Sequence, residues 1–254
     1  MKRLVLIPFI GGVVVAAGMA LTEPATSRFY RAALIAAALL TAGSALITTH
    51  LFAKSDKLFA AWLLIGSGYG LAAIRYSLRL VTMFGGPELL GRAALDTLLI
   101  MQNLLIAIAL WLFVRSWRAT GLATPFSGAA RTGWTLLGVG VAVIVGGYPL
   151  IQGFVTAKAD TVLLVSTLGD MVGIALIVPL AMSALAMRGG LLMHTWLYLA
   201  ACEAFWLLYD VWLALRTTLG IDAPLGPGIE QVIRIIAILF AFIATVAQRR
   251  ALRR

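Results

Sequence analysis

The chain contains few charged residues and a single cysteine. Only 12% of its 254 residues are charged, and ten of these are Asp or Glu. The one cysteine, Cys202, forms no internal disulfide, and it lies in an apolar segment. We therefore expect it to pack as a small buried side chain.

The chain also lacks a polar segment long enough to fold by itself. The longest polar break runs from Ser116 to Arg131, so we expect neither a soluble catalytic domain nor a nucleic-acid-binding domain. No apolar segment contains a lysine, which excludes a retinal Schiff base. The sequence has no Cys/His cluster with zinc spacing, no Walker loop and no Gly-x-Ser-x-Gly elbow.

Apolar residues dominate the chain: they make up 62% of it, and the mean hydropathy is +1.01. Apolar runs of about 18–25 residues recur, and each is long enough to cross a hydrocarbon core of ~30 Å. The sequence predicts an all-α polytopic membrane protein, with one membrane domain over residues 1–254. The eight expected spans are 4–21, 30–52, 58–82, 92–116, 132–156, 160–187, 190–216 and 229–249.

The basic residues are distributed unevenly between the two ends of these spans. With a cytoplasmic N-terminus, twelve of the twenty Lys and Arg residues fall in cytoplasmic segments, among them Lys2, Arg118, Arg131 and Arg254. Cytoplasmic loops of membrane proteins carry such an excess. We therefore predict a multi-pass protein of the cell membrane with both termini in the cytoplasm. Its formal charge of +10 then reflects topology and contact with anionic lipid, with no nucleic acid partner.

The two halves of the chain, 1–118 and 131–254, resemble each other. At an offset of 134 residues Trp62 falls on Trp196, and Arg115 falls on Arg249. An even number of spans in each half gives both copies the same orientation, as in a parallel repeat. The alternative is a chance match among apolar residues.

Several ionisable side chains lie inside the expected spans, where each costs at least ~2.5–3.5 kcal/mol to insert. Hairpin geometry places Arg75 level with Asp96, and Asp210 level with Arg234. It also places Asp170 near the level of Asp210. Two ion pairs, Arg75–Asp96 and Asp210–Arg234, are therefore expected.

Polar residues also recur at helical spacing. Glu203 and Asp210 are seven residues apart and share a helix face, and Asp96 and Asn103 repeat this spacing. We expect these stripes to converge on one outward-facing polar cavity with an aromatic wall. The candidate ligand-binding residues are Arg75, Asp96, Asn103, Asp170, Glu203, Trp206, Asp210 and Arg234. The alternative is that they form structural ion pairs or complement helix dipoles.

The two histidines lie at similar depth near the cytoplasmic ends of their spans. His50 ends the second span, and His194 begins the seventh. Two axial imidazoles bind haem b in some membrane proteins, but no feature of the sequence places these two spans side by side. We therefore expect no cofactor and no metal, with haem b through His50 and His194 as a minor alternative.

Together these features favour a non-enzymatic membrane protein that binds a small or amphipathic ligand, for sensing or transport. Sensing would require a partner protein, because no cytoplasmic domain is expected. One alternative is a structural or anchoring subunit of a membrane complex, with charges paired across subunits. Another is an intramembrane enzyme that modifies lipid. Membrane lipids are expected partners, and a homo-oligomer is left open.

Overall fold

The computed structural model describes residues 2–22, 26–119, 126–155, 161–219 and 226–253. Within these ranges the chain is helical and contains no strand. Its elements are the 3-10 helix η1 (Lys2–Val5) and the helices α1 (Leu6–Leu21), α2 (Thr26–Thr49), α3 (Lys57–Met83), α4 (Arg92–Arg118), α5 (Gly128–Val155), α6 (Thr161–Ala186), α7 (Met193–Leu219) and α8 (Gly226–Leu252). Eight of these helices are long and apolar enough to cross a membrane. The predicted all-α, polytopic fold is therefore confirmed.

Local sequence signals explain several helix boundaries. The side chain of Asp56 caps α3, because its Oδ1 accepts a hydrogen bond of 2.8 Å from the backbone N–H of Leu58. Gly85, just beyond α3, has φ +77°, and Gly189, beyond α6, has φ +91°. Glycine adopts this left-handed conformation readily, so both helices end where the sequence supplies it.

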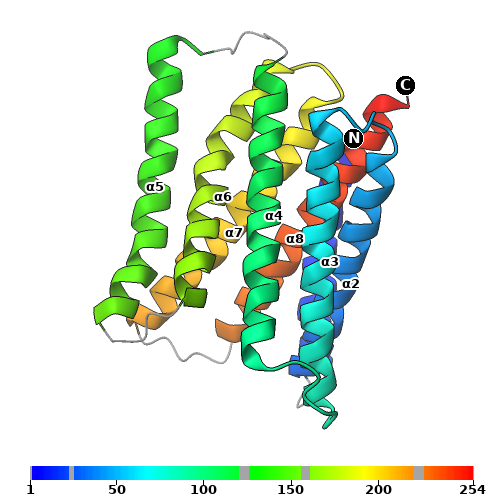
Figure 1. The fold of residues 1–254 in the computed structure, drawn as a ribbon, viewed down its shortest axis with the longest axis vertical. Coiled ribbons are helices and arrows are strands. Elements are labelled where there is room, and N and C mark those ends of the chain that lie inside the picture. The colour runs from blue at the N-terminus through cyan, green and yellow to red at the C-terminus, as the bar shows by residue number, and fades with distance from the viewer. Residues whose placement is uncertain (1, 23–25, 120–125, 156–160, 220–225, 254) are drawn as a thin grey trace.

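Six of the helices form a closed ring. Each member contacts the next in the order α2, α3, α4, α6, α7, α8, and α8 returns to α2 (Figure 1). Helix α1 packs outside the ring against α2 and α8, and α5 packs outside it against α6 and α7. In the described chain α3 makes no close backbone approach to α7 or α8 across the ring. Side chains alone therefore fill its interior.

One end of the ring interior is closed by aromatic side chains. The ring of Phe113 on α4 packs edge-on against Trp62 of α3 at 4.8 Å and against Trp196 of α7 at 5.6 Å. All three side chains are buried. Nearby, the hydroxyl of Tyr69 and the sulfur of Cys202 lie 3.5 Å apart. Cys202 is a buried free cysteine, as expected.

Polar contacts hold α2 against α8. The guanidinium of Arg249 donates hydrogen bonds of 3.0 and 2.9 Å to the backbone oxygen and the hydroxyl of Ser44. Ser44 is also hydrogen-bonded to Thr245, and Thr41 donates to the backbone oxygen of Ile238. In an apolar environment such bonds fix the register of two helices.

The contacts between helices agree only in part with the pairing that a parallel repeat predicts. Helix α1 contacts α8, but its counterpart α5 contacts α7 and, within the described residues, not α4. Helix α4 contacts α6 in the second half, as α8 contacts α2 in the first. The counterparts Trp62 and Trp196 pack on the same ring, Phe113. Arg115, the counterpart of Arg249, instead stacks over Trp111 at 5.1 Å. The internal repeat stays a prediction.

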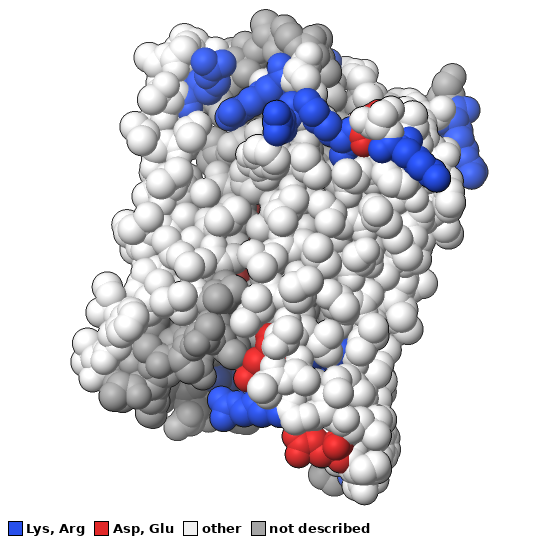
Figure 2. Space-filling view, in the orientation of Figure 1, with Lys and Arg blue, Asp and Glu red and all other residues white. Residues whose placement is uncertain are grey.

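Both chain ends lie at the same end of the helix bundle (Figure 1). A band of Lys and Arg crosses this end (Figure 2). Helices α4 and α8 also end here, and their last turns contain Arg118 and Arg250. The middle of the visible surface is almost entirely uncharged (Figure 2). Exposed apolar side chains such as Ile144, which is 74% exposed, suit contact with lipid. Arg254 and part of the α4–α5 connection lie outside the described residues.

Candidate functional site

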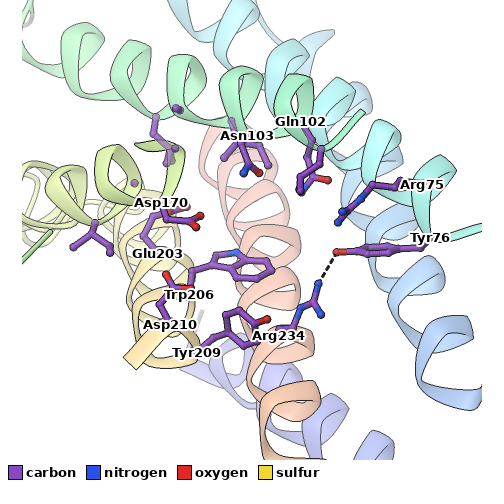
Figure 3. Close-up of a pocket in the computed structure, with 17 residues that line it drawn as sticks. Arg75, Tyr76, Gln102, Asn103, Asp170, Glu203, Trp206, Tyr209, Asp210 and Arg234 are labelled. Atoms are coloured by element: carbon purple, nitrogen blue, oxygen red, sulfur yellow. Dashed lines mark hydrogen bonds between the residues drawn. The ribbon is translucent and has the colours of Figure 1, made fainter. Parts of the chain in front are cut away.

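A cavity of about 220 Å³ lies inside the helix ring, and we call it the central cavity. Its walls come from α3, α4, α6, α7 and α8 (Figure 3). Its polar and aromatic lining residues are Arg75, Tyr76, Gln102, Asn103, Asp170, Glu203, Trp206, Tyr209, Asp210 and Arg234. Seven of the eight predicted ligand-binding residues are in this set, and Asp96 is not. Whether they bind a ligand stays a prediction.

Three carboxylates form one wall of the central cavity. Asp170 projects from α6, and Glu203 and Asp210 project from one face of α7 (Figure 3). Glu203 is 8% exposed, and the three groups are close enough to interact electrostatically. Figure 2 also shows acidic atoms recessed at mid-height of the bundle. Asp170 and Asp210 are half-buried. A charge removed from water is costly unless it is paired, so this wall favours a positive counterpart.

Two glycines of α6 make room for this arrangement. A Cβ at Gly173 would lie 2.5 Å from Oε2 of Glu203, closer than side chains tolerate. A Cβ at Gly169 would lie 3.0 Å from the Cβ of Asn103 on α4. The absence of a side chain at Gly173 therefore lets the Glu203 carboxylate lie against the α6 backbone.

Basic and aromatic side chains form the opposite wall. Nη2 of Arg234 on α8 donates a hydrogen bond of 3.2 Å to the hydroxyl of Tyr76 on α3. The guanidinium of Arg75, a residue 6% exposed, lies 5.0 Å from the centre of the Tyr76 ring. The guanidinium of Arg234 also lies 5.2 Å from the Tyr209 ring and 5.9 Å from the Trp206 ring. These cations are held mainly by aromatic groups.

The two predicted ion pairs are not formed. Asp210 and Arg234 line the same cavity, but in the described part of the chain no ion pair joins them, and Arg234 bonds Tyr76 instead. Likewise Arg75 faces Tyr76 rather than Asp96. Hairpin geometry fixes how deep a residue lies but not the direction in which it points around the helix, and this explains both errors.

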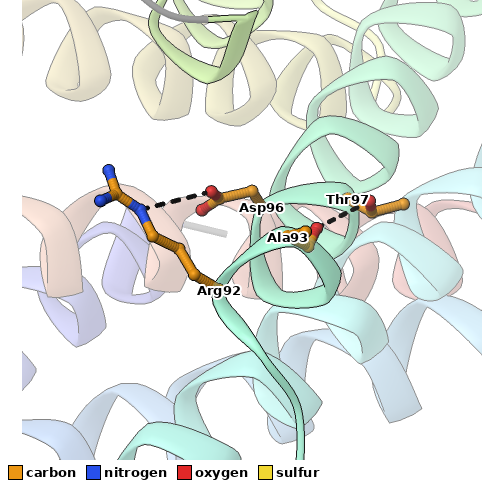
Figure 4. Close-up of polar contacts among 4 residues, drawn as sticks. All are labelled: Arg92, Ala93, Asp96 and Thr97. Atoms are coloured by element: carbon orange, nitrogen blue, oxygen red, sulfur yellow. Dashed lines mark hydrogen bonds and ion pairs between the residues drawn. The ribbon is translucent and has the colours of Figure 1, made fainter.

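Asp96 lies outside the central cavity. Its Oδ2 is 3.8 Å from Nε of Arg92, one helical turn earlier, and the Arg92 side chain is 86% exposed (Figure 4). Beside it, Thr97 donates a hydrogen bond to the backbone oxygen of Ala93 (Figure 4). Glu230, the repeat counterpart of Asp96, forms an ion pair of 3.0 Å with Arg216 across α7 and α8. For Asp96 the structural alternative therefore fits better than ligand binding.

Two important residues of the site were missed by sequence reasoning. Tyr76 directly follows Arg75 inside a span. That position next to a membrane-buried cation is the one sequence feature that could have indicated its role. Gly173 had no signal, because its role depends on Glu203 of another helix. Neither histidine lines the central cavity. His50 is exposed, and α2 and α7 do not contact each other in the described chain, so the haem alternative gains no geometric support.

Comparisons with models of protein families, with curated proteins and with solved structures give no match for this chain. Any proposal for the function of this protein therefore rests on the chemistry of the central cavity. Three carboxylates face two guanidinium groups across a small space that contains Trp206. Such a site suits a small molecule with a positive group, and its basic wall leaves a place for a negative one.

Proposed function

We propose that this membrane protein binds a small organic cation or zwitterion in the central cavity, for sensing or for transport. The positive group of the ligand lies against Asp170, Glu203 and Asp210. The ring of Trp206 contacts the same group through a cation–π interaction.

The observation that carries this proposal is the cluster of three carboxylates on one cavity wall. No ion pair to any of the three is present in the described part of the chain, although a charge at this depth is expensive without a partner. A bound organic cation would supply that partner. The volume of about 220 Å³ is below the ~300–1,000 Å³ of sites for drug-sized molecules, so the ligand is small.

The position of the cavity supports access from the side of the membrane opposite the termini. The cluster of Trp62, Phe113 and Trp196 packs across the ring. It lies near the start of α3, the end of α4 and the start of α7, which is the end of the bundle that carries both termini (Figure 1). The central cavity begins beyond this cluster. With both termini in the cytoplasm, as the charge bias predicts, the cavity faces outward.

The two alternatives make different predictions. A structural subunit would use the buried charges to pair with other proteins and would not need a cavity beside them. A lipid-modifying enzyme would place reacting groups against a lipid head group. The cavity next to Glu203 favours ligand binding over the structural role.

The proposal can be tested with choline and its uncharged analogue 3,3-dimethyl-1-butanol, which has the same shape. We expect choline to raise the melting temperature of the purified full-length protein in detergent, and the analogue to have no effect. Glu203→Gln keeps the size of the side chain while it removes the charge. It should leave folding intact and weaken choline binding roughly tenfold, measured by isothermal titration calorimetry.

Glu88→Gln is the matched control, because Glu88 is exposed in the turn between α3 and α4 and is not part of the cavity. Its choline affinity should equal that of the wild type. If choline does not bind, or binds equally well to Glu203→Gln, the cavity does not select a cation. If Glu203→Gln prevents folding, the carboxylate is structural, and the subunit alternative is favoured.

A further inference from the structure

A second cavity of about 550 Å³ adjoins the central one, and we call it the arginine chamber. It is bounded by α1, α2, α3, α7 and α8. Arg75, Tyr76, Tyr209 and Arg234 line both cavities, so these side chains form the partition between them.

The charge of the chamber has one sign. Four arginines, Arg31, Arg75, Arg79 and Arg234, line it from three different helices, and no acidic residue is part of its lining. Like charges gathered in a confined space of low dielectric repel one another strongly. Two acids directly adjoin lining residues in sequence. Glu230, beside Gln231, is paired with Arg216, and Asp210, beside Tyr209, lines the central cavity and not this chamber. The chamber therefore lacks a negative counterpart of its own.

Several hydrogen-bond donors at the chamber are buried and unused. Nε of Arg75, Nε of Arg234 and the hydroxyl of Tyr30 have no hydrogen-bond partner within the described chain. Among the described residues, the hydrogen-bond acceptor of Arg31 Nε is the sulfur of Met83, at 2.7 Å, and a thioether is a weak acceptor. Buried donors are normally hydrogen-bonded. A single acceptor with several oxygens could bond these donors together.

The outer part of the chamber lies within two helical turns of the helix ends. Arg31 is five residues into α2, and Arg79 is four residues from the end of α3. At about 1.5 Å per residue these side chains start roughly 6–8 Å from the helix ends. Both lie at the end of the bundle opposite the termini. Arg75 lies deeper on the same helix, so a group that enters at Arg31 and Arg79 reaches Arg75 next.

We infer that the arginine chamber binds a phosphoryl group or a similar oxyanion, carried by an anionic lipid head group or by a small soluble phosphate. The planar guanidinium fork matches the oxygens of such a group, and several arginines from different helices can bind it together. Binding offsets part of the positive charge of the four arginines and supplies oxygen acceptors for the unused donors. The inference does not depend on what the central cavity binds, because Arg31 and Arg79 line only the chamber.

The test measures the melting temperature and the binding of three probes to the purified full-length protein in detergent. Inorganic phosphate represents a small soluble anion, and sodium chloride of equal ionic strength is its control. Phosphatidylglycerol represents an anionic lipid, and diacylglycerol is the control for its acyl chains. Stabilisation by both phosphate and phosphatidylglycerol means that the oxyanion alone is sufficient. Stabilisation by phosphatidylglycerol alone identifies the lipid head group as the source.

The decisive variant is Arg31→Gln with Arg79→Gln. We expect its affinity for the stabilising probe to fall roughly tenfold for each arginine removed. Arg28→Gln is the matched control: it removes the same charge three residues earlier on α2, and Arg28 is exposed, beside Phe84 and outside the chamber. Its affinity should stay within about twofold of the wild type.

Three results would overturn the inference. These are no stabilisation by either anionic probe, equal stabilisation by diacylglycerol and phosphatidylglycerol, and unchanged affinity in the double variant. If the double variant does not fold, the single variant Arg79→Gln is compared with Arg28→Gln by the same measurements. Choline binding reports on the central cavity separately, so failure of one site is distinguishable from failure of the other.

Discussion

Arg234 on α8 and Tyr76 on α3 are joined by a hydrogen bond of 3.2 Å between Nη2 and the phenol hydroxyl. Both residues line the central cavity and the arginine chamber. The two helices make no close backbone approach in the described chain. These two long side chains thus bridge the ring and separate an acidic space from a basic one.

Removal of the Tyr76 hydroxyl should destabilise the protein. Tyr76→Phe deletes the acceptor of a buried cation, and a hydrogen bond to a charged group contributes about 1.5–3 kcal/mol. We expect a lower melting temperature in detergent. Tyr209→Phe is the control, since its ring also faces the Arg234 guanidinium at 5.2 Å, and its effect should be less than half as large. Equal losses of stability would mean that the hydrogen bond between Tyr76 and Arg234 contributes no more than the Tyr209 contact.

Double-mutant cycles should rank the partners of Arg234. The coupling energy of Tyr76→Phe with Arg234→Gln should lie within the ~0.5–3 kcal/mol of residues in contact. The coupling of Asp210→Asn with Arg234→Gln should be less than half of that, because no direct ion pair is formed. Unfolding free energies in mixed detergent give both values. A larger coupling for Asp210 would mean that Asp210 and Arg234 form the ion pair that the sequence predicts from their depth.

A methyl group at Gly173 should damage the central cavity without unfolding the protein. In Gly173→Ala the new Cβ displaces the Glu203 carboxylate, which would otherwise lie 2.5 Å away. We expect choline binding to weaken roughly tenfold, because the carboxylate is displaced from its position in the cavity wall. The melting temperature should be nearly unchanged, because the displaced atom is the end of a flexible side chain. Gly70→Ala is the control, because a Cβ there meets no atom within 4 Å. Normal choline binding by Gly173→Ala would argue against a ligand at Glu203.

Truncation of Phe113 should be among the most destabilising changes in the ring. Its side chain is fully buried between Trp62 and Trp196, and Phe→Ala in a core costs about 3–5 kcal/mol. Phe154→Ala, at a residue that is 64% exposed, should cost less than about 0.5 kcal/mol. Thermal unfolding of the two variants in the same detergent compares them. A similar loss in both would mean that the aromatic cluster does not hold α3, α4 and α7 together.

Reporter fusions test the topology on which the outward-facing cavity depends. A reporter after Arg254 and one inserted within 116–131 should both report the cytoplasm, because α4 and α8 end at the basic end of the bundle (Figures 1 and 2). A reporter at Glu88, in the turn after α3, should report the opposite side. A periplasmic signal from either of the first two would place the central cavity and the arginine chamber on the cytoplasmic side.

The helices and most of the candidate site could be predicted from the sequence. Span length and hydropathy depend only on neighbouring residues, so the eight helices follow from the order of the amino acids. The seven-residue spacing of Glu203 and Asp210 places both on one helix face, and the structure puts this face on the central cavity. Asp96 was wrongly grouped with them, because spacing alone does not distinguish a cavity wall from an exposed pair with Arg92.

The sequence by itself determined which segments cross the membrane and which polar residues lie at mid-depth, since both are properties of single helices. Only the tertiary structure decided how the helices rotate about their axes and which of them are neighbours. Rotation turned Arg234 toward Tyr76 rather than into contact with Asp210, and the ring order brought Gly173 against Glu203. It also gathered four arginines from three helices into one chamber. Packing between distant segments sets these relations, and no local pattern along the chain encodes them.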